Sequence, residues 1–249
     1  MSSVPQQPRE CLATDAPAPW PGVARALIVA AHPDDAEYAC GGLIQRLHSW
    51  GVDVAYLIVS DGDRGRSPET SPGESGAERQ SEQVMAAREL GVTDVRFFSL
   101  PDGELRYERC LEGKIVAVIR DVRPQLLVTH DPLTRLYRQH PDHRAVGETA
   151  LAAAFPAARM ATYYMEQLQK GLGAWTVEHA LLFATDAPDW FIELSESHLD
   201  VKIRALQRHE SQAESFGGGI DQRVRLRAEQ AATITPFRCA EAYKYALLR

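Results

Sequence analysis

The chain has 249 residues, of which 45% are hydrophobic and 24% charged, and its formal net charge at pH 7 is −7. These values are ordinary for a globular protein and exclude a disordered or fibrous chain. The net negative charge argues against nucleic acid or an anionic membrane surface as a partner, because neither is attracted to an acidic protein.

The cysteines and the amino-terminal sequence indicate a cytoplasmic protein. The four cysteines are scattered and form no C-x-x-C pair, which predicts free thiols in a reducing compartment. The start of the chain lacks a basic stretch followed by an apolar one, so it does not resemble a secretory signal. No run approaches the ~18 apolar residues that a membrane span needs.

Residues 1–22 contain five prolines and little periodic apolar pattern, and we expect them to form a flexible tail before a single domain at 23–249. Within that domain, apolar runs of strand length alternate with helical patterns. The strands are expected at 25–31, 54–59, 95–100 and 125–130, with strand-like segments at 178–184 and 190–194. The helices are expected at 41–50, 77–90, 110–122, 143–155, 197–212 and 221–233, followed by a short C-terminal segment. This alternation predicts an α/β fold with a doubly wound, mostly parallel sheet flanked by helices.

The end of the first strand carries the sequence A-H-P-D-D-A-E-Y-A-C-G-G, residues 31–42. A dinucleotide-binding sheet would have a glycine-rich turn there, so that backbone amides could approach a pyrophosphate. An imidazole and two carboxylates favour a cation instead. The alternative is a turn whose aspartates cap the next helix.

A second cluster, H-P-D-H at residues 140–143, lies about ten residues beyond the strand at 125–130. Both clusters follow the carboxyl ends of parallel strands, where open α/β sheets place their active sites. His32, Asp35 and His143 therefore form a candidate zinc site, since two histidines and one carboxylate leave a fourth position open. Asp34, beside a ligand, is a candidate general base. The second cluster alone could equally be a helix start.

With these motifs, the chain resembles the LmbE/PIG-L family of zinc-dependent N-deacetylases from about residue 24 to the C-terminus. The resemblance is carried by A-H-P-D-D with Gly41-Gly42 and by H-P-D-H-R-A-V-G at 140–147. Four weaker motifs support it: S-D-G-D-R-G at 60–65, R-x-x-E-x-x-x-A-x-x-x-L-G-V at 79–92, P-D-G-E-L at 101–105 and K-x-x-A-L-x-x-H-x-S-Q at 202–212.

The resemblance implies a Rossmann-like sheet and removal of acetyl from a small-molecule amino sugar of the N-acetylglucosamine type. It makes His32, Asp35 and His143 the Zn²⁺ ligands, although Fe²⁺ suits the same ligands. It also makes Asp34 the general base and later the acid. His140 would stabilise the oxyanion, with Asp142 orienting or charging it.

The resemblance places Arg79 and Asp102, and less strongly Arg64, at the substrate. Each has a structural alternative: Arg79 is three residues from Glu82 on a helix and could simply pair with it, and Asp102 precedes a glycine in a standard turn pattern. The long loop at 61–76 could be a lid or a solvated excursion. His209 could line the site or cap its helix. The other histidines, His48, His130, His179 and His198, are interpreted as surface or core residues.

Two other function classes remain open from the sequence. Two histidines and a carboxylate also form the facial triad of non-haem Fe(II) oxygenases, although the parallel α/β pattern favours hydrolysis. The same fold could also serve as a non-catalytic sugar- or metal-binding protein. The sequence selects no particular N-acylated substrate and leaves the oligomeric state open, a homo-oligomer included.

Overall fold

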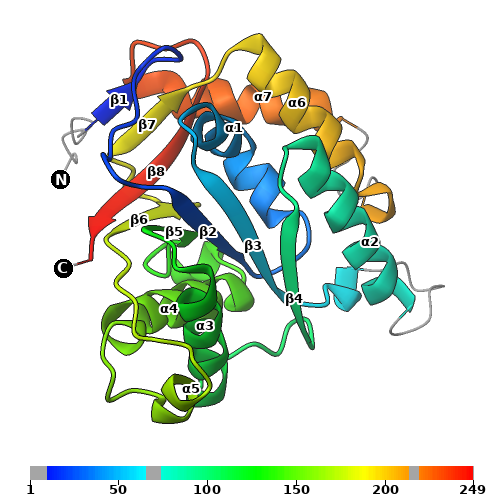
Figure 1. Cartoon of the computed structure of the whole chain (residues 1–249). Helices are drawn as coiled ribbons and strands as arrows, with labels where there is room; N and C mark the ends of the chain where they lie inside the picture. Colours follow the sequence, from blue (N-terminus) through cyan, green and yellow to red (C-terminus); the bar gives the residue numbers. More distant parts are fainter. Residues whose placement is uncertain (1–9, 66–73, 213–218, 249) are drawn as a thin grey trace.

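The computed structural model describes residues 10–65, 74–212 and 219–248. Five neighbouring parallel strands form one side of its sheet, with β2 between β5 and β3 (Figure 1). Residues 26–30 of β2 are fully buried, as expected for a strand covered on both faces. The five strands are β2 Arg25–Ala30, β3 Asp53–Ser60, β4 Asp94–Leu100, β5 Leu126–His130 and β6 His179–Phe183.

Three further strands complete an eight-stranded sheet of order β1-β7-β8-β6-β5-β2-β3-β4. They are β1 Glu10–Leu12, β7 Trp190–Glu193 and β8 Ala240–Leu247. β8 runs antiparallel to both β6 and β7, whereas β1 pairs with β7 in parallel. The sheet is therefore mixed but mostly parallel, as predicted, in one α/β domain.

The helices cover both faces of the sheet, which confirms the doubly wound arrangement (Figure 1). Alternate side chains of β2 point into two separate cores, because successive residues of a strand face opposite sides. One face carries α1 Asp35–Ser49, α2 Glu74–Glu89, α6 Glu196–Gln207 and α7 Ile220–Ala231. The other carries α3 Arg109–Val122, α4 Pro141–Ala152 with the π-helical turn Ala153–Ala158, and α5 Met165–Gln169.

Two terminal segments differ from the sequence expectation. The C-terminal segment is the long strand β8, which we did not predict because its core-facing positions include the polar Glu241 and Tyr243. At the other end, residues 10–12 form β1, and the ring of Trp20 stacks on Trp190 with centroids 5.2 Å apart. This part of the expected flexible tail thus packs on the domain, while residues 1–9 lie outside the described residues.

The topology brings the motifs singled out in the sequence to one edge of the sheet. The segments that follow β2, β3, β4 and β5 all leave the sheet at its carboxyl edge, and they carry the residues from His32, Asp61, Asp102 and Asp131 onward. In the described part of the chain, no helix is both long and apolar enough to span a bilayer. Short 3-10 turns connect the elements at Asp63–Gly65, Leu136–Arg138, Glu210–Gln212 and Ala232–Ile234.

Candidate metal centre

The turn after β2 is closed by its own side chains. Asp35, the first residue of α1, accepts the backbone N–H of His32 at 2.8 Å through Oδ2. Between them, Asp34 adopts a left-handed conformation with φ 97° and ψ −26°. That conformation costs an L-residue about 1–2 kcal/mol, so surrounding contacts must hold it.

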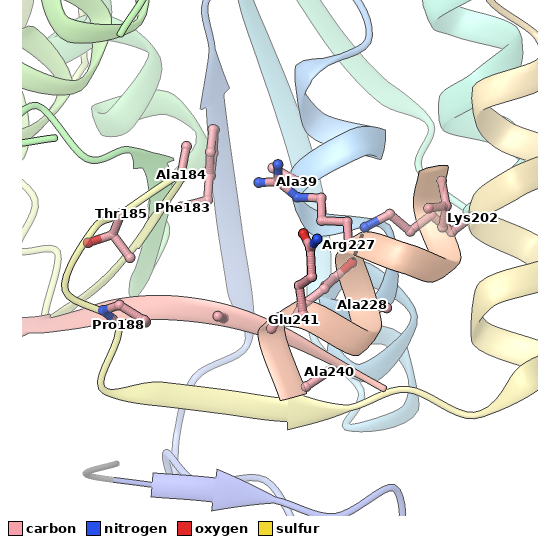
Figure 2. A pocket seen from close by; sticks show the side chains of 14 residues that line it. Ala39, Phe183, Ala184, Thr185, Pro188, Lys202, Arg227, Ala228, Ala240 and Glu241 are labelled. Carbon is pink, nitrogen blue, oxygen red and sulfur yellow. Dashed lines mark hydrogen bonds and ion pairs between the residues drawn. The ribbon is translucent and has the colours of Figure 1, made fainter. Parts of the chain in front are cut away.

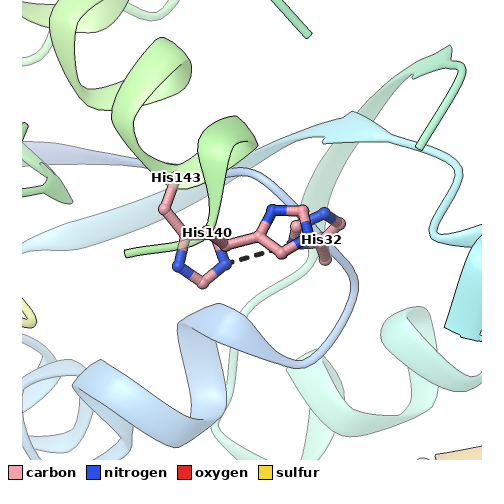
Figure 3. A group of neighbouring side chains, drawn as sticks. All are labelled: His32, His140 and His143. Carbon is pink, nitrogen blue, oxygen red and sulfur yellow. Dashed lines mark hydrogen bonds between the residues drawn. The ribbon is translucent and has the colours of Figure 1, made fainter. Parts of the chain in front are cut away.

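The structure brings the three predicted ligands together. His32 Nδ1 lies 3.2 Å from His143 Nε2, and Asp35 places Oδ2 3.4 Å from His32 Nδ1 and Oδ1 3.3 Å from His143 Nε2. Donor atoms bound tetrahedrally at about 2.0–2.1 Å lie about 3.3 Å apart. Each histidine nitrogen has a similar spacing from the other histidine and from one oxygen of Asp35, Oδ2 for His32 and Oδ1 for His143, which suits a small metal ion. Figure 3 shows His32 and His143 facing each other, with His140 beside them.

The far side of the His32 ring is held by two carboxylates. Its Nε2 lies 3.0 Å from Asp102 Oδ1 and 3.3 Å from Asp142 Oδ2. Burial disfavours charge on His32, but the hydrogen bonds to Asp102, Asp142 and Asp35 outweigh it and raise its pKa to about 12. The surroundings therefore strongly favour a positive charge at this ring, which a metal ion at Nδ1 would supply in place of a proton.

Another histidine, His130, lies within reach of the three predicted ligands. His130 is buried, stacks on His143 with centroids 4.1 Å apart, and has Nε2 3.4 Å from Asp35 Oδ2. That nitrogen already accepts the N–H of Ala31, so His130 supports the cluster from behind. Burial and the neighbouring His143 lower its pKa to about 4, which keeps the ring neutral. Sequence reasoning placed His130 in the core or on the surface and missed these contacts.

We had expected Asp142 to orient His140, but its carboxylate does not do so. Both of its oxygens are used elsewhere: they accept the backbone N–H groups of Gly103 at 2.7 Å and Leu105 at 3.2 Å, besides contacting His32. Its backbone N–H instead donates to His140 Nδ1 at 3.3 Å. This contact makes Nδ1 the acceptor and leaves Nε2 as the N–H that His140 can offer to a ligand.

His140 is exposed and neutral at the mouth of the cluster. Partial desolvation of its ring and the nearby His32 and His143 lower the pKa of His140. A neutral imidazole with a free Nε2–H can donate a hydrogen bond without bringing a second charge next to a metal ion.

Asp34 has the electrostatics of a general base. Burial raises the pKa of its carboxyl to about 6, against the opposing effect of Arg79. A carboxyl with a raised pKa takes up a proton more readily at neutral pH than an ordinary aspartate does. Its backbone N–H donates to Gln83 Oε1 at 2.9 Å.

Arg79 is buried and holds the turn around Asp34. Its guanidinium donates to Asp34 Oδ2 at 3.0 Å, to the Pro33 carbonyl at 2.7 Å and to the Gly62 carbonyl at 2.5 Å. The alternative pairing with Glu82 is wrong, because the Glu82 carboxylate accepts hydrogen bonds from Ser211 instead.

A cavity of about 380 Å³ opens above these groups. Arg64 lies at its rim with an exposed side chain, and its backbone and Nε donate to Asp102, while Nη2 pairs with Glu104. The structure therefore brings all the sequence-predicted site residues to this cavity except Asp142, which lies behind His32. The cavity is lined by His32, Asp34, Asp35, Arg64, Gly65, Arg79, Asp102, His140 and His143.

Two further motif elements, Lys202 and the glycine pair Gly41-Gly42, meet at Glu241 of β8 beside α1. Lys202 and Glu241 form a buried ion pair with Nζ and Oε1 2.5 Å apart, at the side of a second cavity of about 280 Å³ (Figure 2). Glu241 also accepts the N–H groups of Gly42 and Leu43 in α1, each at 2.8 Å. A Cβ on Gly41 would lie 2.7 Å from Lys202 Cγ, which explains a glycine there.

His209 does not line the cavity, and its ring faces Glu37 of α1 and not the last carbonyls of its own helix. It is fully buried below the turn that holds Asp34, with Nε2 3.5 Å from Glu37 Oε2. The part of the loop at 66–73 lies outside the described residues, and the prediction of a lid falls largely on that segment.

Comparison with known proteins assigns this chain to a family. The family model described as PIG-L, GlcNAc-PI de-N-acetylase, matches residues 27–154. The diacetylchitobiose deacetylase of Thermococcus kodakarensis is 34% identical over 195 residues, which cover 78% of this chain and 72% of the relative. A probable N-acetyl-alpha-D-glucosaminyl L-malate deacetylase 2 of Bacillus cereus is 29% identical and covers 88% and 96%.

Solved structures agree in fold. The N,N'-diacetylchitobiose deacetylase from Pyrococcus horikoshii has a TM-score of 0.84 at 25% identity, covering 90% of this chain and 84% of that one. The 4-carboxy-2-hydroxymuconate hydratase from Pseudomonas putida has a TM-score of 0.73 at 25% identity, covering 91% and 97%. The fold thus supports more than one reaction. The family model and the deacetylase relatives together show that this chain belongs to the PIG-L/LmbE family of N-acetylglucosamine-type deacetylases.

Proposed function

We propose that the protein removes an acetyl group from the amide nitrogen of an N-acetylglucosamine-type substrate, with Zn²⁺ held by His32, Asp35 and His143. The observation that carries the proposal is the set of 3.2–3.4 Å spacings among the donor atoms of these three side chains. Zinc bound there would polarise the amide carbonyl and lower the pKa of a water molecule from 15.7 to roughly 7.

Asp34 moves the protons of the reaction. Its carboxylate takes a proton from the attacking water and then delivers it to the amide nitrogen as the C–N bond breaks. Its pKa of about 6 suits both roles, because it is ionised at neutral pH yet remains basic enough to hold a proton briefly. Protonation of the nitrogen makes the amine a good leaving group.

His140 stabilises the charge that develops on the carbonyl oxygen. Its Nδ1 accepts the N–H of Asp142, so Nε2 carries the proton that is donated to this oxygen. Asp142 contributes by fixing this tautomer through its backbone and by holding His32 through its carboxylate.

The sugar would bind in the cavity of about 380 Å³. Arg64 is the best-placed of the three predicted substrate contacts, because its side chain is exposed at the rim. The two terminal nitrogens of Arg79 and both carboxylate oxygens of Asp102 already form hydrogen bonds within the protein, so any contact of theirs with substrate is added to a positioning role.

An Fe(II) oxygenase and a non-catalytic binding protein are less well supported. The carboxyl group of Asp34 beside the ligands serves hydrolysis, and the deacetylase relatives cover most of the chain. Fe²⁺ at the same ligands would still support deacetylation. Dependence of any activity on 2-oxoglutarate and O₂ would identify the oxygenase instead.

The proposal is tested by acetate release from N,N'-diacetylchitobiose, N-acetylglucosaminyl malate and an N-acetylglucosaminyl inositol. We expect hydrolysis of at least one, its loss on dialysis against a chelator and its recovery with Zn²⁺. Asp34→Asn should retain the metal and lose turnover; Asn is the suitable replacement because it tolerates a left-handed backbone. A purified, zinc-loaded protein that releases no acetate from any of these conjugates would contradict the proposal.

A further inference from the structure

A line of buried polar side chains leads from Asp34 into the protein, away from the cavity. Gln83 of α2 accepts the Asp34 N–H through Oε1 at 2.9 Å and donates to Glu37 Oε1 through Nε2 at 2.8 Å. The other carboxylate oxygen of Glu37 lies 3.5 Å from Nε2 of His209. Gln83, Glu37 and His209 are each 0% exposed. Three elements, α1, α2 and the segment after α6, thus meet beneath one residue.

The contacts define which way the Gln83 amide points. If it turned over, its NH₂ group would face the Asp34 N–H and its oxygen would face the Glu37 carboxylate, so both hydrogen bonds would be lost. Glu37 therefore fixes the amide, and the amide fixes the backbone of Asp34. Leaving either end of the buried Gln83 amide unpaired is costly, so these two hydrogen bonds resist rotation of its side chain.

Asp34 needs this support because its φ is 97°. α2 supplies it from two positions one helical turn apart: Arg79 binds the Asp34 carboxylate, and Gln83 binds the Asp34 backbone N–H. The carboxylate and the backbone of the same residue are thus held independently. Neither Gln83 nor Glu37 lines the cavity.

We propose that Gln83, oriented by Glu37, is a positioning residue that holds Asp34 in its left-handed conformation and so aims the carboxylate at the reacting water. The inference rests on the proposed role of Asp34 as general base. His209 completes the chain by facing the second oxygen of Glu37. Gln83 acts only through Asp34 and does not touch substrate.

Gln83→Met tests the inference, since it keeps the length of the side chain and removes both hydrogen bonds. We expect kcat to fall about 10–100-fold, the loss typical of a misplaced catalytic group, with KM and metal content unchanged. Gln80→Met is the matched control, because Gln80 lies one turn earlier on α2 and its side chain donates, within the part of the chain that the structure describes, to Ser99 Oγ at 2.9 Å. That variant should keep wild-type kcat.

A charge swap tests the orientation of the amide. Gln83→Glu alone sets two carboxylates against each other at the 2.8 Å contact with Glu37, and kcat should fall at least as far as in Gln83→Met. Adding Glu37→Gln rebuilds both hydrogen bonds, with residue 37 now the donor. We expect this double variant to recover kcat at least tenfold over the single Gln83→Glu variant.

A crystal structure of Gln83→Met supplies a readout that does not depend on turnover. Residue 34 should leave the left-handed region, while His32, Asp35 and His143 keep their positions. A purely structural role for Gln83 predicts a lower Tm with unchanged kcat per metal-loaded molecule, and that result would overturn the inference. So would an unrecovered charge swap. Turnover by Asp34→Asn would instead refute the general base itself, whereas an inactive Asp34→Asn beside a fully active Gln83→Met would refute only the role of Gln83.

Discussion

Asp102 and His32 form a carboxylate–imidazole pair, in which one ring nitrogen of His32 faces Asp102 and the other faces His143. Asp102 Oδ1 lies 3.0 Å from His32 Nε2, while Nδ1 of the same ring lies 3.2 Å from His143 Nε2. Metal-binding histidines commonly bond a carboxylate through the nitrogen that does not bind the metal, which fixes the ring and increases its basicity. We therefore propose that Asp102 contributes to metal affinity, whereas the family resemblance implied a role at the substrate.

Asp102→Ala should therefore weaken metal binding about 10–100-fold. The measurement is competition with a chromophoric chelator, and Asp102→Asn should lie between wild type and alanine because it keeps an acceptor for His32. Glu104→Ala, two residues along and exposed, is the control and should bind metal normally. Unchanged metal affinity together with a raised KM would return Asp102 to the substrate.

His140 and His143, on the same turn of chain, should separate metal binding from catalysis. His143→Ala should lose the metal, because its Nε2 is one of three mutually close donor atoms. His140→Ala should keep the metal and lose about 10²–10³ in kcat, the usual cost of removing one oxyanion donor. Metal content by atomic absorption and kcat by acetate release measure the two effects. Loss of metal from His140→Ala would show that this residue is a ligand.

Arg79 should set the acidic limb of the pH–rate profile. Burial raises the pKa of Asp34 to about 6, and the guanidinium of Arg79 opposes that rise. Because the ionised carboxylate is the active base, kcat/KM should fall as the pH drops through about 6. Removing the positive charge in Arg79→Met raises the pKa further, so the limb should move upward by about one pH unit.

The control for this experiment is Arg88→Met, which removes an exposed charge from the last turn of the same helix. Its profile should match wild type. If Arg79→Met raises KM and leaves the acidic limb in place, Arg79 contacts the substrate and has little influence on Asp34.

The closeness of His32, Asp35 and His143 could be predicted from the sequence, because both motifs follow strands that end at the same edge of the sheet. Strands β2 and β5 are continuous apolar runs, so the parallel sheet and the carboxyl edge that carries His32 and His143 follow from the pattern. The direction of each side chain does not follow from it. Asp142 illustrates this limit: its place in H-P-D-H is evident, but only the fold shows that its carboxylate turns toward His32.

The buried residues that hold the site in place were harder to predict. Gln83 and Glu37 are polar residues within helices, and a helical pattern gives no sign that such residues are fully buried. β8 was missed for a related reason, since the Glu241 side chain faces the core and interrupts the apolar alternation of the strand. Pairings over nearly 200 residues, such as that of Glu241 with α1, depend on tertiary structure.

The buried pair of Lys202 and Glu241 provides a last prediction, on stability. Lys202→Met keeps the aliphatic stem and removes the charge, which leaves the Glu241 carboxylate in the core with only its neutral partners, two backbone N–H groups and the hydroxyl of Tyr243. Breaking a buried ion pair by removing one partner typically costs 3–5 kcal/mol, and these remaining donors place the expected loss near the lower end, about 3 kcal/mol.

Urea unfolding of the wild type and of Lys202→Met measures this loss directly, and Arg204→Met is the matched control. Arg204 lies on the same helix, two residues along, but is half-exposed and 3.9 Å from Glu89. Exposed ion pairs contribute about 0–1 kcal/mol, so the control should unfold nearly as wild type does. Equal unfolding free energies for both variants would mean that the hydrogen bonds from α1 and from the Tyr243 hydroxyl are enough to stabilise Glu241. Together with that hydroxyl, the mid-helix contact at Gly42 and Leu43 would then account for the burial of this carboxylate without any need for the lysine.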